Sequence, residues 1–187
     1  MLGLRRRIRI ETARMTLRLP AVPILPCRRL AASLAAAALL ALLPPPAEGG
    51  SLRLSEGQPF SEVRQIRLSP DGSFAVYAHD AVVDDAHEVW SVPLAGGAPV
   101  RLSGLFPSGV EPYQLEISPD SQTVVYIARQ ETLTRTELFS APIAGPEGSW
   151  TKLNQPLVAD GNVEWFEIAP GSDRVGFRAD VGTDGVF

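Results

Sequence analysis

Residues 66–77 read Ile66-Arg-Leu-Ser-Pro-Asp-Gly-Ser-Phe-Ala-Val-Tyr77, a β-rich segment interrupted by a Ser-Pro-Asp-Gly turn. Proline fixes φ ahead of the bend, and glycine permits the positive φ that a tight turn needs. The aromatic and β-branched residues after the turn favour an extended strand. The segment therefore predicts two strands, at 65–68 and 74–78, joined by a tight turn.

The same pattern returns twice further along the chain. LEISPDSQTVVY occupies 115–126 and FEIAPGSDRVGF occupies 166–177, so that Pro70, Pro119 and Pro170 follow one another at spacings of 49 and 51 residues. A second pattern, EVWSVPL at 88–94 and ELFSAPI at 137–143, also repeats after 49 residues. Two separate patterns with one period indicate an internal structural repeat.

Each repeat predicts four short strands between turn signals; in the first repeat the last two strands are expected at 88–92 and 99–102. Four strands at a period of about 50 residues are typical of a β-propeller blade. A β-sandwich is the alternative, but it does not require near-identical turns at a fixed period. We therefore predict an all-β chain forming a partial β-propeller of four-stranded antiparallel blades.

About two and a half blades are expected in residues 50–187: blade 1 at about 62–103, blade 2 at about 111–154, and a truncated blade 3 at about 161–187. The strands at 65–68, 114–117 and 163–168 should hold the same innermost position in their blades. The sequence leaves the total number of blades open. Ser51–Leu54 resembles the outer strand of blade 1, which predicts a strand donated to a further blade.

The first 49 residues predict a secretory signal peptide. Arg28 and Arg29 precede Leu30–Leu43, an apolar run with one serine, and small residues follow in Ala47-Glu-Gly49. This order is typical of a signal that is cleaved, here after Gly49, and the run is shorter than the roughly 20 residues of a membrane span. An uncleaved membrane anchor is the alternative.

Export would place the protein in the periplasm or outside the cell, with no stable membrane span after cleavage. The natural start is either Met1 or Met15. Cleavage would also remove Cys27, the one cysteine, so we expect no disulfide in the mature chain.

The charge divides unevenly along the chain. Residues 1–49 hold eight arginines against two acids, which leaves 17 − 8 = 9 basic and 21 − 2 = 19 acidic residues for the remainder. A nucleic-acid partner is therefore not expected, because phosphate neutralisation requires clustered lysine and arginine.

The Ser-Pro-Asp-Gly turn, the Phe-Ala-Val-Tyr strand after it and the Glu-Val-Trp-Ser-Val-Pro strand together resemble the repeats of TolB-like β-propellers. Related repeats occur in the propeller domains of prolyl oligopeptidase and dipeptidyl peptidase relatives. The resemblance covers residues 51–187 and implies an extracytoplasmic interaction scaffold. The α/β domain that precedes the propeller in TolB has no counterpart in the short segment after Gly49.

The residues singled out by the repeats are assigned structural roles. Aspartate in a Pro-Asp-Gly turn caps its own backbone, so a pair of catalytic carboxylates is the weaker interpretation. Aromatic residues at equivalent strand positions are expected to pack between blades. The turn residues are Ser69, Pro70, Asp71, Gly72, Ser118, Pro119, Asp120, Pro170 and Gly171, and the packing residues are Tyr77, Trp90, Tyr126, Phe139 and Phe177.

No catalytic, cofactor or metal site is predicted. His79 and His87 flank an acidic loop, but a metal needs several converging ligands and the acidity is not repeated in the next blade, so a solvated hairpin tip is favoured. The chain has neither the Gly-x-Ser-x-Gly pattern of a hydrolase nor a phosphate-binding glycine loop. We therefore expect no enzymatic activity from these residues.

Two functions remain open. The first is a non-catalytic scaffold that binds a protein or a cell-envelope component, whose identity the sequence does not reveal. The second is the N-terminal propeller of a secreted serine peptidase whose hydrolase domain lies beyond residue 187. A downstream Gly-x-Ser-x-Gly would favour the peptidase, and further Ser-Pro-Asp repeats would favour the scaffold.

Overall fold

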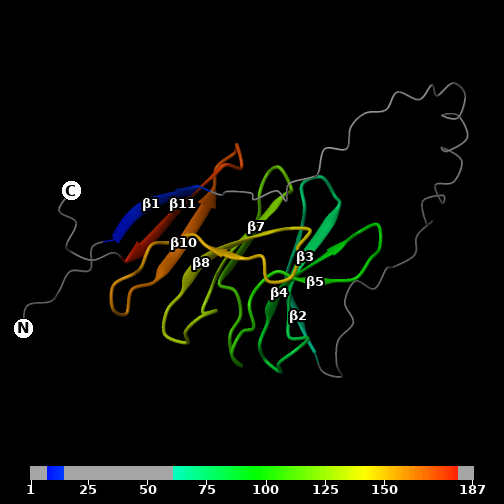
Figure 1. Ribbon diagram of the computed structural model, residues 1–187, viewed down its shortest axis with the longest axis horizontal. Coiled ribbons are helices and arrows are strands. Elements are labelled where there is room, and N and C mark those ends of the chain that lie inside the picture. The colour runs from blue at the N-terminus through cyan, green and yellow to red at the C-terminus, as the bar shows by residue number, and fades with distance from the viewer. Residues whose placement is uncertain (1–7, 15–60, 181–187) are drawn as a thin grey trace, which may run out of the picture. The chain divides into compact units, whose positions relative to one another are not determined.

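The computed structural model describes residues 61–180, together with the backbone of residues 8–14. These residues belong to one compact unit and form three antiparallel sheets without any helix (Figure 1). The prediction of an all-β chain built from antiparallel sheets is therefore confirmed for this part. The predicted apolar run Leu30–Leu43, the cleavage site at Gly49 and the strand Ser51–Leu54 lie outside the described residues.

The first two sheets have the same strand order and lengths that match closely. The first sheet has the order β2-β3-β4-β5 and the second has the order β6-β7-β8-β9. The strands of the first sheet are β2 (Val63–Leu68), β3 (Phe74–His79), β4 (Glu88–Pro93) and β5 (Val100–Arg101). Those of the second are β6 (Gln114–Ile117), β7 (Thr123–Ala128), β8 (Glu137–Pro142) and β9 (Thr151–Lys152).

The strand register also repeats between these two sheets. Tyr77 lies opposite Trp90 in the first sheet, and Tyr126 lies opposite Phe139 in the second. A slip of one residue would turn every side chain to the other face, so a shared register places equivalent residues on equivalent faces. Positions that are 49 residues apart can therefore be compared directly.

The third sheet contains β10 (Val163–Ile168) and β11 (Arg174–Asp180), with β1 (Ile8–Arg14) on the far side of β11. Figure 1 shows β1 alongside β11, and the two strands pair antiparallel along their whole length. In the order β10-β11-β1, the N-terminal strand holds the position that β4 and β8 hold in the other sheets. β11 therefore pairs with β10 on one side and, on the other, with a strand that lies ahead of Gly49 in the chain.

The three tight turns have the same backbone geometry. Gly72, Ser121 and Ser172 occupy equivalent positions and have φ values of 71°, 62° and 58°. The strands before these turns, β2, β6 and β10, hold the same end position in their sheets. The first strands β2 and β6, which belong to different sheets, are also in contact with each other.

The hydrophobic core lies between the sheets. One cluster joins Val76 and Val89 of the first sheet to Tyr126 and Phe139 of the second, and all four are fully buried. The alternate face of β7 and β8 packs against Phe166, Val175 and Phe177 of the third sheet. Side chains of a central strand alternate between faces, so the second sheet is buried on both sides.

Candidate functional site

Each predicted turn residue takes part in a compact hydrogen-bonded turn. The Ser69 hydroxyl donates to the Asp71 carboxylate at 2.6 Å, and Ser69 Oγ accepts the Phe74 amide at 2.9 Å. Ser118 and Asp120 reproduce the first contact, also at 2.6 Å. Hydrogen bonds from Ser69 and Ser73 lower the pKa of Asp71 to about 2. The two carboxylates thus serve separate turns instead of forming a pair.

The turns are joined across neighbouring sheets by a contact that the repeats did not predict. The Asp71 amide donates to Ser121 Oγ at 3.1 Å, and the Asp120 amide donates to Ser172 Oγ at 3.0 Å. In each pair a serine with positive φ links its turn to the turn of the preceding sheet. The first sheet has Gly72 at this position, which carries no hydroxyl group.

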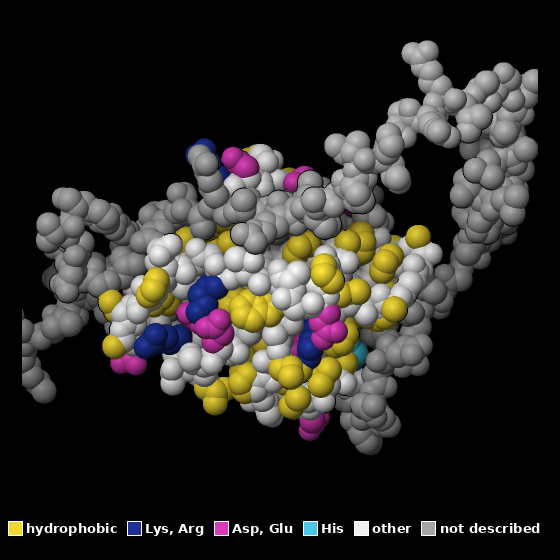
Figure 2. Space-filling view, viewed as in Figure 1, with side chains coloured by type: hydrophobic (Ala, Val, Ile, Leu, Met, Phe, Trp, Pro, Cys, Tyr) yellow, Lys and Arg dark blue, Asp and Glu magenta, His cyan; other side chains and the backbone are white. Residues whose placement is uncertain are grey.

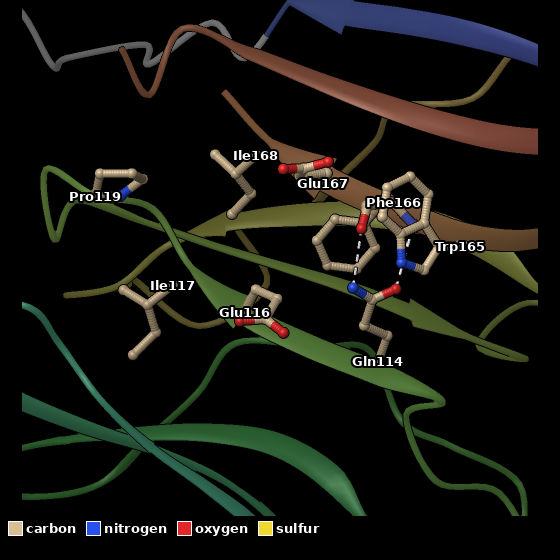
Figure 3. Close-up of a pocket in the computed structure, with 8 residues that line it drawn as sticks. All are labelled: Gln114, Glu116, Ile117, Pro119, Trp165, Phe166, Glu167 and Ile168. Carbon is tan, nitrogen blue, oxygen red and sulfur yellow. Dashed lines mark hydrogen bonds between the residues drawn. The ribbon is translucent and has the colours of Figure 1, made fainter. Parts of the chain in front are cut away.

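A second set of contacts joins the first strand of a sheet to the next repeat, at the segment ahead of β6 or at β10. The Gln65 amide donates to the Pro112 carbonyl. The Gln114 amide donates to the Phe166 carbonyl at 2.9 Å, and Gln114 Oε1 accepts the Phe166 amide at 3.2 Å. The equivalent glutamines thus fix the separation of each pair of sheets, and Figure 3 shows both bonds of Gln114.

A hollow of about 290 Å³ opens beside this contact, between β6 and β10 (Figure 3). The side from β6 and its turn consists of Gln114, Glu116, Ile117 and Pro119. The side from β10 consists of Trp165, Phe166, Glu167 and Ile168. Ligand sites usually have volumes of about 300–1,000 Å³, so this hollow lies at the lower end of that range and suits a small group.

The predicted packing residues fall into two groups. Tyr126, Phe139 and Phe177 are buried between sheets, and the rings of Tyr126 and Phe139 stack with their centroids 5.4 Å apart. Tyr77 and Trp90 belong instead to a cluster on the face of the first sheet that points away from the second sheet.

That face of the first sheet exposes large apolar side chains at its first strand. Ile66 and Leu68 are 59% and 63% exposed, whereas Leu115 and Phe166, the equivalents of Ile66, are at most 1% exposed. Exposed apolar groups of this kind mark surfaces suited to a partner. Figure 2 shows one face of the protein, on which hydrophobic side chains surround a few adjacent pairs of opposite charge.

On the outward face of the third sheet, β11 carries small and charged residues. Gly176 and Arg178 stand where the second sheet has Val125 and Ile127, which are buried against the third sheet. Arg178 is exposed and forms an ion pair with Glu164 at 2.6 Å. Trp165 pairs with Arg178 across the strands and is 49% exposed, so an apolar side chain also lies on this face.

The loop between β3 and β4 is solvated only at its tip. Asp84 and Asp85 are exposed at this tip, whereas the flanking His79, Asp80 and His87 are buried. Burial lowers the pKa of His79. Within residues 61–180, no group of three or more His, Cys, Asp or Glu side chains is arranged to hold a metal ion.

Glu88 begins β4 as a fully buried carboxylate. Among the described residues no side chain donates a hydrogen bond to its oxygens. Burial raises its pKa, against the opposing effect of nearby backbone amides and of Arg101. The equivalent Glu137 accepts a 2.8 Å bond from Lys152. Arg101 replaces that lysine in the first sheet, and it bonds to Glu147 of the second sheet instead. Sequence comparison of the two repeats could not reveal this difference, because both sheets carry an acid and a base at these positions.

The described segments contain no helix that is long and apolar enough to cross a membrane. Comparison of the chain with protein-family models gives no match, and comparison with curated protein sequences gives none either.

Proposed function

We propose that this chain is part of an exported, non-catalytic β-propeller scaffold of the TolB-like type, which binds a protein or a cell-envelope component. The observation that carries the proposal is that Ile66 and Leu68 are exposed on the first sheet, whereas Leu115, the equivalent of Ile66 in the second sheet, is buried. The face of the first sheet that carries Ile66 and Leu68 thus resembles the faces that pack between sheets. At β2, however, this face is open to another molecule.

The propeller assignment is supported by three repeated features. The first two sheets share strand order and register, the turns share a positive φ at the same position, and equivalent glutamines of the first strands bond to the next repeat. In a propeller the first strands of successive blades converge on an axis, and the contact between β2 and β6 fits that arrangement.

The export assignment is supported by the arginine pair, the apolar run Leu30–Leu43 and the small residues up to Gly49. An exported chain that keeps no cysteine relies on packing and on the inter-sheet hydrogen bonds for its stability. N-terminal sequencing of exported material tests this part: a mature terminus near Gly50 is expected, and a mature protein that retains residues 1–40 contradicts it.

Site-specific photo-cross-linking tests the partner surface. A photoreactive phenylalanine analogue replaces Ile66 in the full chain, in cells that naturally produce it, and the control places the analogue at Val82, which is 55% exposed at a loop tip. A discrete adduct from position 66 and none from position 82 is expected. No adduct at position 66, or the same adduct at both positions, would refute a partner surface on the first sheet.

A further inference from the structure

The hollow between β6 and β10 combines two kinds of surface. Ile117, Ile168 and Pro119 are apolar, whereas Glu116 and Glu167 contribute carboxylates from the same register position of neighbouring strands (Figure 3). The lining residues include no lysine, arginine or histidine. Within the described part of the chain, neither carboxylate has an ion-pair or hydrogen-bond partner.

The floor of the hollow is preformed. Both polar groups of the Gln114 side chain are occupied by the backbone of Phe166, and the Phe166 side chain is 1% exposed. Gln114 therefore holds the two strands together through both polar atoms of its side chain. Glu116, which is half-buried, is left as the polar group that a guest can engage from within the hollow.

The rim is aromatic. Trp165 occupies the position equivalent to Gln114 and is 49% exposed, so its ring is accessible from solvent. Tryptophan is the aromatic side chain that attracts cations most strongly, and it is enriched among the residues that dominate protein–protein affinity. Trp165 and the two carboxylates line the same hollow, and both kinds of group favour a guest with a positive charge.

We propose that this hollow binds the side chain of a lysine or arginine from a partner polypeptide, with the alkyl stem against Ile117 and Ile168 and the charged head at Glu116. This inference rests on the proposed scaffold function and assigns one of its contacts. The volume suits one long side chain, and such side chains bury an apolar stem while exposing a charged head. The excess of 19 acidic over 9 basic residues after position 49 also attracts a cationic partner.

Other occupants fit less well. An anion would meet two carboxylates, which repel it. A calcium ion requires about six to eight oxygen ligands, and no group of three or more acidic, histidine or cysteine side chains in residues 61–180 is arranged for a metal. A wholly apolar side chain would leave the Glu116 carboxylate partly desolvated and unpaired.

The first sheet supplies a matched variant for the test. Arg67 stands at the position equivalent to Glu116, so an arginine is compatible with this place in the strand. The variant Glu116→Arg reverses the charge in the hollow, and Glu116→Gln removes the charge with a smaller change of shape. Glu111→Gln removes an exposed carboxylate outside the hollow and is the control.

The experiment titrates the full chain with capped tripeptides that carry lysine, arginine, norleucine or glutamate between two glycines, and follows tryptophan fluorescence. Lysine and arginine peptides are expected to bind about fivefold or more tightly than the norleucine peptide, as a single ion pair in water implies. The glutamate peptide should not bind. Glu116→Arg and Glu116→Gln should abolish the preference at an unchanged melting temperature, Glu111→Gln should keep it, and Trp165→Phe should remove the signal.

Equal binding of all four peptides would overturn the proposal, as would an unaltered preference in Glu116→Gln. A signal that persists in Trp165→Phe would also overturn it, because the binding would then lie elsewhere. The cross-link at Ile66 separates this result from the scaffold function. An adduct without peptide binding rejects the hollow alone, whereas peptide binding without an adduct rejects the partner surface on the first sheet.

Discussion

Ser121 Oγ accepts a hydrogen bond from the backbone amide of Asp71 at 3.1 Å, which joins two turns that lie 50 residues apart in the chain. Ser121 is 2% exposed and has a φ of 62°, a conformation that most L-residues avoid. Ser172 makes the same contact to Asp120. The second and third sheets are thus each tied to the preceding sheet by a serine held in a strained conformation.

Ser121→Ala should lower the free energy of unfolding by about 1–2 kcal/mol, because a buried hydrogen bond is lost while the positive φ remains. Ser121→Gly should cost less, since glycine adopts this φ readily and Gly72 occupies the equivalent position. Urea denaturation measures both changes. Equal losses for the two variants would contradict the strained conformation, and no loss for alanine would contradict the role of the hydroxyl.

Glu88→Gln should stabilise the protein at pH 7, because the buried carboxylate has no side-chain hydrogen-bond partner among the described residues and desolvation is the largest influence on its charge. Burial raises the pKa of Glu88 above 4.5, the usual value for a glutamate. The charged carboxylate therefore destabilises the folded state at pH values above the raised pKa, and this destabilisation disappears as the pH falls to 4.5. The increase in melting temperature caused by Glu88→Gln should therefore become smaller as the pH is lowered from 7 to 4.5.

Glu137→Gln is the control for this effect, because Glu137 is the repeat equivalent of Glu88 but bonds to Lys152 at 2.8 Å. At pH 7 this variant should lose stability, since the lysine would keep its charge without this partner. A gain at Glu137, or a gain at Glu88 that does not depend on pH, would contradict the assigned difference between the two sheets.

The chain should self-associate through the first sheet, where Ile66 and Leu68 are 59% and 63% exposed, and Ile66→Ser combined with Leu68→Ser should reduce that association. The melting temperature should change little, since exposed side chains contribute only about 0.5 kcal/mol or less. Val82→Ser, at an exposed loop tip, should leave association unchanged. Sedimentation velocity measures the association, and equal behaviour of the double variant and the parent would reject this surface as its cause.

Removal of residues 1–14 should expose one edge of β11, because β1 pairs along Arg174–Asp180. A chain that starts at Met15 should therefore show faster hydrogen exchange at alternate amides of β11 than the full chain. The amides of β7, which lies between β6 and β8, should be unaffected. Unchanged protection of β11 would show that the N-terminal strand does not cover this edge in solution.

The strands and turns could be predicted from the sequence because each depends on local residues. The Ser-Pro-Asp-Gly segment contains both the proline and the glycine that its turn requires, and alternating apolar residues define the strands on either side. Observed boundaries extend the expected strands slightly, as at β2, which begins at Val63 instead of Gln65. An irregularity between Arg64 and Arg67 accounts for this difference, since it interrupts the alternation.

Contacts between sheets could not be predicted in the same way. Ser121 and Gln114 are ordinary polar residues in the sequence, and only the separation of the sheets makes them bridging groups. The pairing of β1 with β11 joins residues more than 150 positions apart, and no pattern in Ile8–Arg14 predicts it. The hollow likewise depends on how far β6 and β10 are apart, a quantity that neither strand determines alone.

The central claim is that the repeated sheets are arranged around an axis as the blades of a propeller. Pulsed electron–electron double resonance, which measures distances between two spin labels, tests this claim directly. In the full chain with Cys27→Ser, one label pair replaces Arg67 and Glu116 on the first strands, and a second pair replaces Ala98 and Ser149 ahead of the last strands. Blades that converge on an axis predict a distinctly longer distance for the second pair than for the first. Equal distances for the two pairs would indicate sheets stacked in parallel and would contradict the propeller.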